Sequence, residues 1–444
     1  MIRKVLIANR GEIAVRIIRA CREMGIETVA VYSEADKEAL HTQLADEAVC
    51  IGPAASVDSY LNMEQIISAT ITSGADAIHP GFGFLSENSK FAALCEQCNI
   101  TFIGPDAEVI QKMGHKAHAR NTMIEAKVPV IPGSTEAIYD AETGKKIAAK
   151  IGYPVIVKAA LGGGGKGMRV AKTPQEFEES FKTAQKETKM AFGDDTMYIE
   201  HFVENPRHIE FQILADQFGN VIHLGERDCS IQRNHQKMIE ESPSIALTET
   251  LRRKMGDAAV KAAKAAHYVN AGTVEFLLEE NGNFYFMEMN TRIQVEHPVT
   301  EWVTGIDLVQ EQIKIASGLP LTYKQEDIKL CGHAIECRIN AENPKKNFRP
   351  SPGTIKDIYL PGGKGVRIDT AIYSGYTVPA YYDSMLAKLI VHADTRKEAI
   401  AKMQCALGEI IIDGVETNID YQYEIMNHPD FQSGNINIEF IEKM

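Results

Sequence analysis

The chain has 444 residues, of which 44% are hydrophobic and 24% are charged, a balance typical of an ordinary globular protein of about three domains. The 47 lysines and arginines and the 60 aspartates and glutamates give a net charge of −13. Broad nucleic-acid binding needs a basic surface, so this charge argues against a nucleic-acid partner. No apolar run approaches the ~20 residues that span a bilayer, and the first residues lack the apolar core of a signal peptide. We therefore expect no membrane partner.

The eight cysteines are scattered through the chain, which predicts reduced thiols in a cytoplasmic protein rather than a disulfide framework. Cys95 and Cys98 form the only CxxC pair, and neither a second pair nor a histidine accompanies it. A structural role in a helix is therefore favoured over a redox or zinc site.

In the first hundred residues, short apolar runs alternate with segments whose apolar residues recur at helical spacing. The runs lie at 5–8, 28–32, 75–79 and 100–103. This rhythm predicts an α/β fold with a parallel, doubly wound sheet. The first turn contains one glycine, so a dinucleotide-binding fingerprint is absent. The segment 79–88 is rich in glycine and aromatic residues and follows a strand, where sheets of this kind carry their sites.

A domain boundary is expected near Gly114 and another near residue 330. A small α+β lobe is expected within the middle part, from 151 to about 203, and strands punctuated by glycine and proline dominate after residue 331. The other expected elements are strands over 207–240, a helix over 251–267, a hairpin over 272–290, a helix over 299–317 and a final helix over 395–409.

A strand that ends at Lys158 is followed by four glycines, Gly162 to Gly165, by Lys166 and by another strand. Consecutive glycines let backbone N–H groups close around phosphate oxygens, and the lysines add positive charge. The alternative is a hairpin tip in which the glycines serve only the turn. The arrangement differs from a Walker A loop, because no GK[ST] sequence opens a helix, and it favours a mobile lid over a nucleotide.

The sequence Asn281-Gly282 between two apolar runs is a strong hairpin signal. A two-residue turn there places Glu275 directly opposite Glu288, and like charges in that position repel each other. Either one carboxyl is protonated or a cation bridges the two. Asn290 lies on the same face as Glu288, and two carboxylates with an amide oxygen suit Mg²⁺ or Mn²⁺ rather than Zn²⁺.

Polar residues continue at every second position after Glu288, as Asn290, Arg292, Gln294 and Glu296. If the segment stays extended, these side chains share one face. The alternative is a strand with one solvated face, which would favour lysine and glutamate over this mixture.

Two further segments carry basic residues. Arg338 shares one face of an expected strand with Glu336 and Asn340. Residues 227–237 form a polar, basic stretch that is either a surface loop or, beside a phosphate site, an anion pocket.

Five ordered motifs together resemble the ATP-grasp enzymes and, among them, the biotin carboxylase family, over essentially the whole chain. The motifs lie at 7–14, 79–88, 226–230, 286–297 and 381–385. The resemblance implies a preATP-grasp, Rossmann-like N-terminal domain (1–114), an ATP-grasp domain (115–330) with its α+β lid at about 131–203, and a C-terminal α+β domain (331–444).

The resemblance also implies a role for individual residues. ATP phosphates are expected on Lys116, Lys158, Gly163, Gly164 and Gly165, and the adenine and ribose on Glu200, Phe202, Val203, His208, Gln232, His235 and Ile438. Two Mg²⁺ or Mn²⁺ ions are expected on Glu275, Glu288 and Asn290, of which the two glutamates also belong to the ATP site. Bicarbonate is expected on Lys237, Arg292, Gln294, Val295 and Glu296, and biotin on Arg338 and Phe82. The catalytic residues are then Glu296 as the base, Lys237 at the γ-phosphate, Arg292 and, for the biotin enolate, Arg338.

The implied reaction is the ATP-dependent carboxylation of biotin by bicarbonate through carboxyphosphate, giving N1′-carboxybiotin, ADP and phosphate. It is the first half-reaction of acetyl-CoA carboxylase, or alternatively of a pyruvate or other acyl-CoA carboxylase. No Met-Lys-Met tripeptide occurs, so biotin is expected on a separate biotin carboxyl carrier protein, with separate carboxyltransferase subunits. A homodimer is also implied, with Arg16 and Asp383 at or near its interface.

Several positions depart from the family pattern. Phe82 replaces a frequent tyrosine, His115 replaces a frequent acidic residue, and Glu280 lengthens the hairpin tip. Two rival functions remain: another ATP-grasp ligase, such as a carbamoyl-phosphate synthetase half or a purine-pathway carboxylase, and a nucleotide-binding regulatory subunit without turnover. The second should have lost Glu296, Lys237 or a metal-binding glutamate, and all are present.

Overall fold

A computed structural model describes residues 2–134, 136–159, 168–192 and 195–444, and these residues form two compact units. The first unit contains Met1–Val128, Arg207–Phe276 and Glu288–Met444, and the second contains Pro129–Pro206 and Leu277–Met287. Each unit is described by itself. The division into domains at residues 114 and 330 stays a prediction.

The N-terminal sheet of the first unit is fully parallel, as the sequence predicts, with the order β3-β2-β1-β4-β5. Its strands are β1 (Lys4–Ile7), β2 (Glu27–Ser33), β3 (Glu47–Gly52), β4 (Ala77–His79) and β5 (Thr101–Phe102). Val5 and Ile7 pack on one face of β1 and Leu6 packs on the other, and all three are fully buried. Burial of both faces is the property of a doubly wound sheet. β3 was missed although it contains the apolar run Ala48-Val49-Cys50-Ile51, and it is largely exposed.

Helices connect these strands, and two more helices follow the last strand. They are α1 (Gly11–Glu23), α2 (Leu40–Leu44), α3 (Met63–Ser73), α4 (Ser89–Gln97), α5 (Ala107–Gly114) and α6 (Lys116–Glu125), with short 3₁₀ turns at Glu34–Asp36 and Ser56–Asp58. Cys95 is buried in α4 and Cys98 caps that helix, and both are free thiols. The CxxC pair is therefore part of a helix end.

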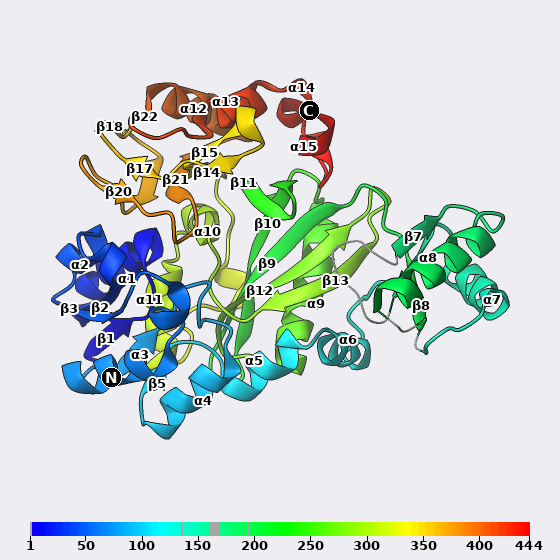
Figure 1. The fold of residues 1–444 in the computed structure, drawn as a ribbon, viewed down its shortest axis with the longest axis horizontal. Coiled ribbons are helices and arrows are strands. Elements are labelled where there is room, and N and C mark those ends of the chain that lie inside the picture. The colour runs from blue at the N-terminus through cyan, green and yellow to red at the C-terminus, as the bar shows by residue number, and fades with distance from the viewer. Residues whose placement is uncertain (1, 135, 160–167, 193–194) are drawn as a thin grey trace. The chain divides into compact units, whose positions relative to one another are not determined.

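A second sheet of eight strands forms the centre of the first unit, with the order β13-β12-β9-β10-β11-β14-β21-β19. Figure 1 shows β9, β10 and β12 running side by side. The outer ends of β12 and β13 belong to the second unit. The strands are β9 (Arg207–Ala215), β10 (Val221–Arg233), β11 (Gln236–Ser242), β12 (Asn270–Leu278), β13 (Phe284–Asn290), β14 (His333–Asn340), β19 (Val366–Thr370) and β21 (Met385–Ala393), and α9 (Glu249–Ala265) packs on β9 and β10.

The basic stretch 227–237 is not a loop, contrary to the first of the two alternatives above. It forms the end of β10, a tight turn and the start of β11. Asn234 and His235 have φ values of 49° and 63°, and a two-residue hairpin turn of type I′ requires positive φ at both positions. Arg227 and Asp228 are buried within the stretch because they pair with residues outside it, such as Glu210 and Arg207. The strands expected over 207–240 are confirmed as β9, β10 and β11.

The expected helix at 299–317 is two helices, α10 (His297–Thr304) and α11 (Leu308–Ala316). Gly305 ends α10 in the left-handed conformation, with φ of 73°, and the Asp307 carboxylate accepts the Gln310 N–H to start α11. The extended segment expected from Glu288 to Glu296 ends at Asn290, because β13 stops there.

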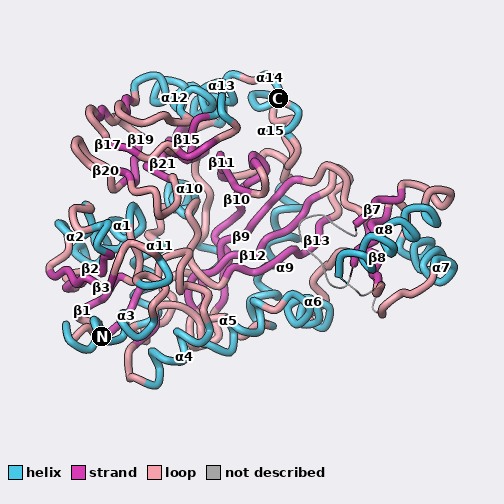
Figure 2. Tube along the Cα trace, in the orientation of Figure 1, coloured by secondary structure: helices cyan, strands magenta, loops and turns pink. Residues whose placement is uncertain are grey.

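The C-terminal part of the first unit adds short strands and four helices around a large apolar cluster. Figure 2 shows that α12 and α13 lie together, and both contact β14. The predicted helix over 395–409 is confirmed as α12 (Arg396–Glu409), but it is not the last. The remaining elements are β15 (Glu342–Asn343), β16 (Arg349–Pro350), β17 (Gly353–Thr354), β18 (Ile358–Tyr359), β20 (Thr377–Val378), β22 (Ile411–Ile412), α13 (Ile419–Asn427), α14 (Pro429–Ser433), α15 (Phe440–Lys443) and the 3₁₀ turns Gln325–Asp327 and Pro344–Lys346.

The second unit is a small α+β structure. Its antiparallel sheet has the order β7-β6-β8, formed by β6 (Val155–Ala159), β7 (Met168–Ala171) and β8 (Met197–His201). α7 (Ala141–Ile151) and α8 (Phe177–Phe192) contact this sheet, and Phe177 and Phe181 are fully buried in its core. Within the described residues, no helix of the chain is long and apolar enough to cross a membrane.

The tip of the β12–β13 hairpin differs from the expected two-residue turn. The Glu279 N–H donates to the Asn283 carbonyl at 2.9 Å, and the Gly282 N–H donates to the Glu279 carbonyl at 3.0 Å. Gly282 has φ of 85°. The loop therefore has three residues, with the extra one at Glu280, and the predicted pairing of residues at the turn is wrong by one position.

Candidate active site

The Glu296 carboxylate lies between two cations in the first unit. The Lys237 ammonium is 2.6 Å from Oε1, and a guanidinium nitrogen of Arg338 is 3.0 Å from Oε2. Lys237 comes from β11 and Arg338 from β14, which are neighbouring strands, and Glu296 stands immediately before α10. Burial alone would raise the pKa of Glu296, but Lys237 and Arg338 outweigh it and hold the pKa well below its usual range. Glu296 is therefore an ionised carboxylate that can accept a proton.

Lys237 is the centre of a group of three carboxylates. Its ammonium lies 2.6 Å from Glu210, 3.0 Å from Glu275 and 2.6 Å from Glu296. Burial alone would lower the pKa of Lys237, but these three charges together hold it well above the usual value. The side chain is a permanent cation with more anionic partners than one charge neutralises, so it can exchange one of them for a phosphate oxygen.

Glu275 gathers the polar residues that follow β13. Its Oε1 accepts hydrogen bonds from the Asn290 amide at 2.8 Å and from the Gln294 amide at 2.9 Å. The extended backbone predicted for this segment is wrong beyond Asn290, yet the side chains of Asn290 and Gln294 both contact Glu275. Burial alone would raise the pKa of Glu275, but Lys237 and His208 outweigh it and hold the pKa well below its usual range.

The negative charges of Glu275 and Glu288 repel each other. Partial removal of the Glu288 carboxyl from water raises its pKa, and the charge of Glu275 raises it further. Two carboxylates that repel each other, beside an amide oxygen at Asn290, make an oxygen-rich set that fits a hard divalent cation.

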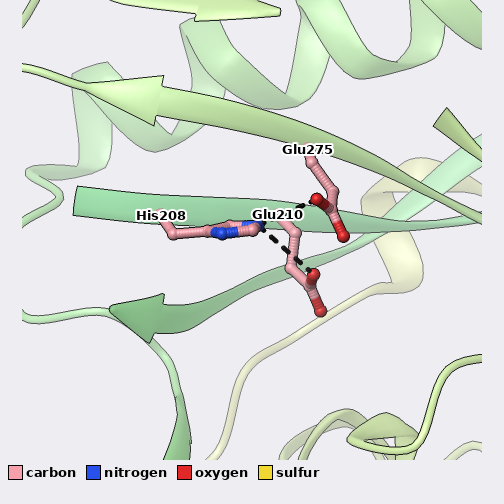
Figure 3. A group of neighbouring side chains, drawn as sticks. All are labelled: His208, Glu210 and Glu275. Carbon is pink, nitrogen blue, oxygen red and sulfur yellow. Dashed lines mark ion pairs between the residues drawn. The ribbon is translucent and has the colours of Figure 1, made fainter. Parts of the chain in front are cut away.

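A histidine and two glutamates, which could also bind a metal ion, form a second group that shares Glu275 with this one. Figure 3 shows His208, Glu210 and Glu275 turned toward one another. The His208 Nε2 is 3.0 Å from Glu275 and 4.0 Å from Glu210, and all three residues are buried. His208 and Glu210 are two residues apart on β9 and therefore share a face with Glu275 of β12, the adjacent strand. The Lys237 ammonium contacts both carboxylates, but its single charge offsets only one of them.

Arg227 donates hydrogen bonds to Glu210 and to residues near it. It was not among the site residues predicted from the sequence. It is fully buried, and its guanidinium donates to Glu210 at 2.5 Å and to Gln294 at 2.7 Å. Its further acceptors are Gln212, Thr300 and Thr273. A buried guanidinium with several acceptors fixes their positions, because moving any one would leave a charged donor without a partner. The polar alternation Glu210-x-Gln212 on β9 is the signal that could have revealed it.

Arg338 also pairs with Glu240 on β11, at 2.6 Å. Burial raises the pKa of Glu240 to about 7, against the opposing effect of Arg338. A pocket lies beside these residues, and it is lined by Arg233, Gln236, Lys237, Met238, Arg338, Asn340, Glu342, Phe348 and Asn418. The two cations that contact Glu296 therefore also line this pocket.

Arg292 points to the glycine- and aromatic-rich segment rather than to Glu296. Its Nε donates to Glu87 at 2.9 Å, and a second nitrogen donates to the Asn290 amide oxygen at 3.0 Å. The Glu87 carboxylate also accepts the Thr291 N–H at 3.0 Å. Glu87 lies in the motif at 79–88 but was not among the predicted site residues.

The residues expected around the nucleotide divide between the two units. In the first unit, Lys116 is exposed at the start of α6, Gln232 is buried on β10, His235 is exposed in the hairpin turn and Ile438 is half-buried before α15. In the second unit, Lys158 pairs with Glu200, the Phe202 N–H donates to Pro154 at 2.9 Å, and Val203 is buried. Gly163, Gly164 and Gly165 lie outside the described residues.

Three further expectations concern the surroundings. Phe82 is half-buried, and its carbonyl accepts the Asn9 amide at 2.7 Å. The Arg16 side chain is buried and lies 2.8 Å from both Glu301 and Asp307 of the same chain. Asp383 is exposed.

Three family models match the chain in succession. They describe the biotin carboxylase N-terminal domain (residues 1–110), the ATP-binding domain of the carbamoyl-phosphate synthase L chain (115–324) and the biotin carboxylase C-terminal domain (336–443). Biotin carboxylase 1 of Bacillus subtilis is 61% identical over 443 residues, which cover 100% of this chain and 98% of the relative.

Two solved structures are also similar. The biotin carboxylase of Campylobacter jejuni, crystallised as a complex named biotin carboxylase-beta-gamma-ATP, has a TM-score of 0.90 and 52% identity over 100% of this chain and 99% of that one. The biotin carboxylase domain dimer of Hydrogenobacter thermophilus 2-oxoglutarate carboxylase, in complex with MgADP, ADP and bicarbonate, has a TM-score of 0.88 and 52% identity over 100% and 98%.

Proposed function

The chain belongs to the biotin carboxylase family of ATP-grasp ligases, and we propose that it uses ATP and bicarbonate to carboxylate the N1′ atom of carrier-borne biotin. The observation that carries this proposal is the ionised Glu296 carboxylate held between Lys237 and Arg338 at the edge of a pocket. It offers a base, a cation for phosphate and a cation for an oxyanion within one site.

Glu296 accepts the proton of bicarbonate in the proposed reaction, and the resulting oxyanion attacks the γ-phosphorus of ATP to give carboxyphosphate and ADP. Lys237 turns from Glu296 to the γ-phosphate. Because Lys237 is the cation that lowers the Glu296 pKa most, its departure makes Glu296 a stronger base when the substrate is present.

Carboxyphosphate then divides into CO₂ and phosphate in a site closed to water. The phosphate removes the N1′ proton of biotin, and the enolate attacks CO₂. Arg338 stabilises the enolate oxygen, since a guanidinium stays charged at all relevant pH values and presents several donors. In this proposal Arg292, Gln294 and the Val295 backbone hold bicarbonate. Biotin contacts Arg338, which lines the pocket, and Phe82.

Glu275, Glu288 and Asn290 are the residues that would hold Mg²⁺ or Mn²⁺. Their fit rests on the repulsion between the two carboxylates, which a cation relieves. When bound, the metal neutralises charge on the transferring phosphoryl group. The remaining nucleotide contacts are those proposed for Lys116, Lys158, Gly163 to Gly165, Glu200, Phe202, Val203, His208, Gln232, His235 and Ile438.

The proposed partners are a biotin carboxyl carrier protein, carboxyltransferase subunits and a second copy of the chain. The Hydrogenobacter thermophilus relative is a domain dimer of a 2-oxoglutarate carboxylase, so family membership leaves the final acceptor open. Acetyl-CoA is the acceptor we propose, with pyruvate or another acyl-CoA as the alternative.

Steady-state ATP hydrolysis tests the proposal. We expect hydrolysis to require bicarbonate and to rise when free biotin is added. Another ATP-grasp ligase would respond to its own amine or nucleotide substrate and not to biotin, and a regulatory subunit would bind ATP without turnover. A folded protein that binds ATP and ignores biotin contradicts the proposal.

A further inference from the structure

Lys388 is a fully buried lysine in the middle of β21 that the proposed mechanism does not use. An ammonium group is costly to bury unless it is paired and hydrogen-bonded. Well-packed apolar residues in place of a buried ion pair often leave stability unchanged or increase it. The presence of a charged side chain here therefore calls for a function besides packing.

The ammonium of Lys388 has three partners from three parts of the first unit. It donates to the Val295 carbonyl oxygen at 2.9 Å, and it lies 3.2 Å from Glu12 on α1 and 3.8 Å from Asp369 on β19. The contact with Val295 is a hydrogen bond, and the contacts with Glu12 and Asp369 are ion pairs. The Val295 carbonyl is the only uncharged member of the three, and the two carboxylates offset the charge that is brought to it.

In the eight-stranded sheet, Lys388 lies beside Arg338, which donates a hydrogen bond to Glu296. Lys388 pairs directly with Arg338 of β14 on one side and with Asp369 of β19 on the other. Directly opposed residues in an antiparallel sheet point to the same face. Arg338 reaches the Glu296 carboxylate, and Lys388 reaches the carbonyl of Val295. Two adjacent strands thus hold two consecutive residues of the same segment.

We propose that Lys388 is a positioning residue, which sets the peptide between Val295 and Glu296 and so orients the bicarbonate-binding segment toward the base. A peptide unit is planar, so a hydrogen bond to the Val295 oxygen also fixes the direction of the Glu296 N–H and the start of the Glu296 side chain. This inference rests on the proposed function of Val295 and Glu296. Glu12 supports it from α1, because its charge compensates Lys388.

The main test compares the kinetics of three variants with those of the wild type. Lys388→Met removes the donor but leaves Glu12 buried and unpaired, which can prevent folding. The double variant Glu12→Gln/Lys388→Met removes both charges and keeps the volume, so it separates positioning from stability. Lys402→Met is the matched control, since Lys402 also donates to backbone carbonyls in the same region, those of His392 at 2.6 Å and Lys364 at 3.0 Å, and touches none of the proposed site.

We expect kcat/KM for bicarbonate to fall at least about tenfold in the double variant, the usual effect of losing a charge-assisted hydrogen bond, while KM for ATP stays within about twofold of wild type. The Lys402→Met variant should change neither. Lys388→Arg, which keeps a charged donor, should recover part of the loss. A parallel rise in the KM values of ATP and bicarbonate, or unchanged bicarbonate kinetics, overturns the proposal.

Amide hydrogen exchange supplies a readout that needs no turnover. The double variant should exchange faster than wild type in peptides that cover residues 291–297, and the Lys402→Met variant should not. Equal exchange in that segment overturns the positioning role even if the proposed reaction is absent. Wild-type protein without bicarbonate-dependent, biotin-stimulated hydrolysis contradicts the proposed function instead, so the two failures are distinguishable.

Discussion

Glu296 shows how single residues in this site acquire their chemistry from their neighbours. Its carboxylate is buried, and burial disfavours the charge, yet Lys237 and Arg338 keep it ionised. The sequence motif could predict which residues belong to the site. It could not predict that Lys237 pairs with Glu210, because that contact depends on the register of strands far apart in the chain.

Replacing Glu296 by alanine tests its role as the base. We expect kcat to fall by about 10²–10⁴-fold, the usual contribution of a general base, while the affinity for ATP changes little. Turnover and equilibrium nucleotide binding measured on the same preparation provide the check. Glu409→Ala, at an exposed position of α12, serves as the control. An equal loss of nucleotide affinity would argue against a base.

Glu241 can be used to test how the stability of the fold depends on pH, because its partners His333 and Arg396 are not part of the proposed site. It is buried on β11, where it accepts from His333 at 2.8 Å and from Arg396 at 2.6 Å. Burial alone would raise its pKa, but these partners lower the pKa to about 2. A pKa lower in the folded than in the unfolded state adds stability that is present above the unfolded pKa and is lost as pH falls toward 2.

Glu241→Gln should therefore lower the free energy of unfolding at pH 7 by on the order of 3 kcal/mol. The difference from wild type should shrink as pH falls from about 4.5 toward 2, since the wild-type carboxyl then loses its advantage. Urea unfolding at several pH values measures both. A difference that stays constant with pH would show that the ionised form is not what stabilises the fold.

Individual elements show where sequence patterns are sufficient and where they fail. The β12–β13 hairpin follows from Asn281-Gly282 between apolar runs, but the loop has three residues, because Gly282 takes the left-handed conformation after the turn. The segment 227–233 lies within the strands expected over 207–240, and the alternative of a surface loop is wrong because the segment is the end of β10. Arg227 is polar and fully buried, and only its partners on other strands make that burial possible.

The β12–β13 hairpin also carries the proposed metal ligands, which can be tested as a unit. Glu288→Lys replaces a repelled carboxylate by an ammonium that neutralises Glu275 without a metal. We expect at least a tenfold loss of Mg²⁺-dependent nucleotide binding, roughly the effect of one lost charge-assisted contact. Titration with ATP at fixed and at zero Mg²⁺ measures it. An unchanged Mg²⁺ dependence would remove these residues from the metal site.

At the scale of the whole chain, the eight-stranded sheet joins regions that the sequence divides at residue 330. β11 pairs with β14 through four residue pairs, from Ile239–Cys337 to Ser242–Ala334, and Ile239 and Cys337 share one core cluster. Four strands of the parallel N-terminal sheet, β1, β2, β4 and β5, were predictable because each carries its own apolar run. The pairing of β11 with β14 could not be predicted in this way, because the two strands are separated by about ninety residues of chain.

A truncated chain tests that continuity. Residues 1–330 alone would expose the edge of β11 and the apolar residues that β14 covers, and such edges promote aggregation. We expect this fragment to be insoluble or to lack a cooperative thermal transition, whereas the full chain unfolds cooperatively. A soluble fragment with a sharp transition would show that the sheet is stable without β14, β21 and β19.

The net charge of −13 belongs to the whole molecule, yet Lys237, Arg338 and Arg227 gather around Glu296 in its interior. The central claim is that this site moves a carboxyl group from bicarbonate to biotin at the expense of ATP. The direct measurement is the transfer of label from ¹⁴C-bicarbonate to free biotin, followed together with ADP. We expect acid-labile labelled biotin that appears only with ATP, a divalent cation and bicarbonate, and that is absent in Glu296→Ala. ATP hydrolysis without label in biotin would contradict it.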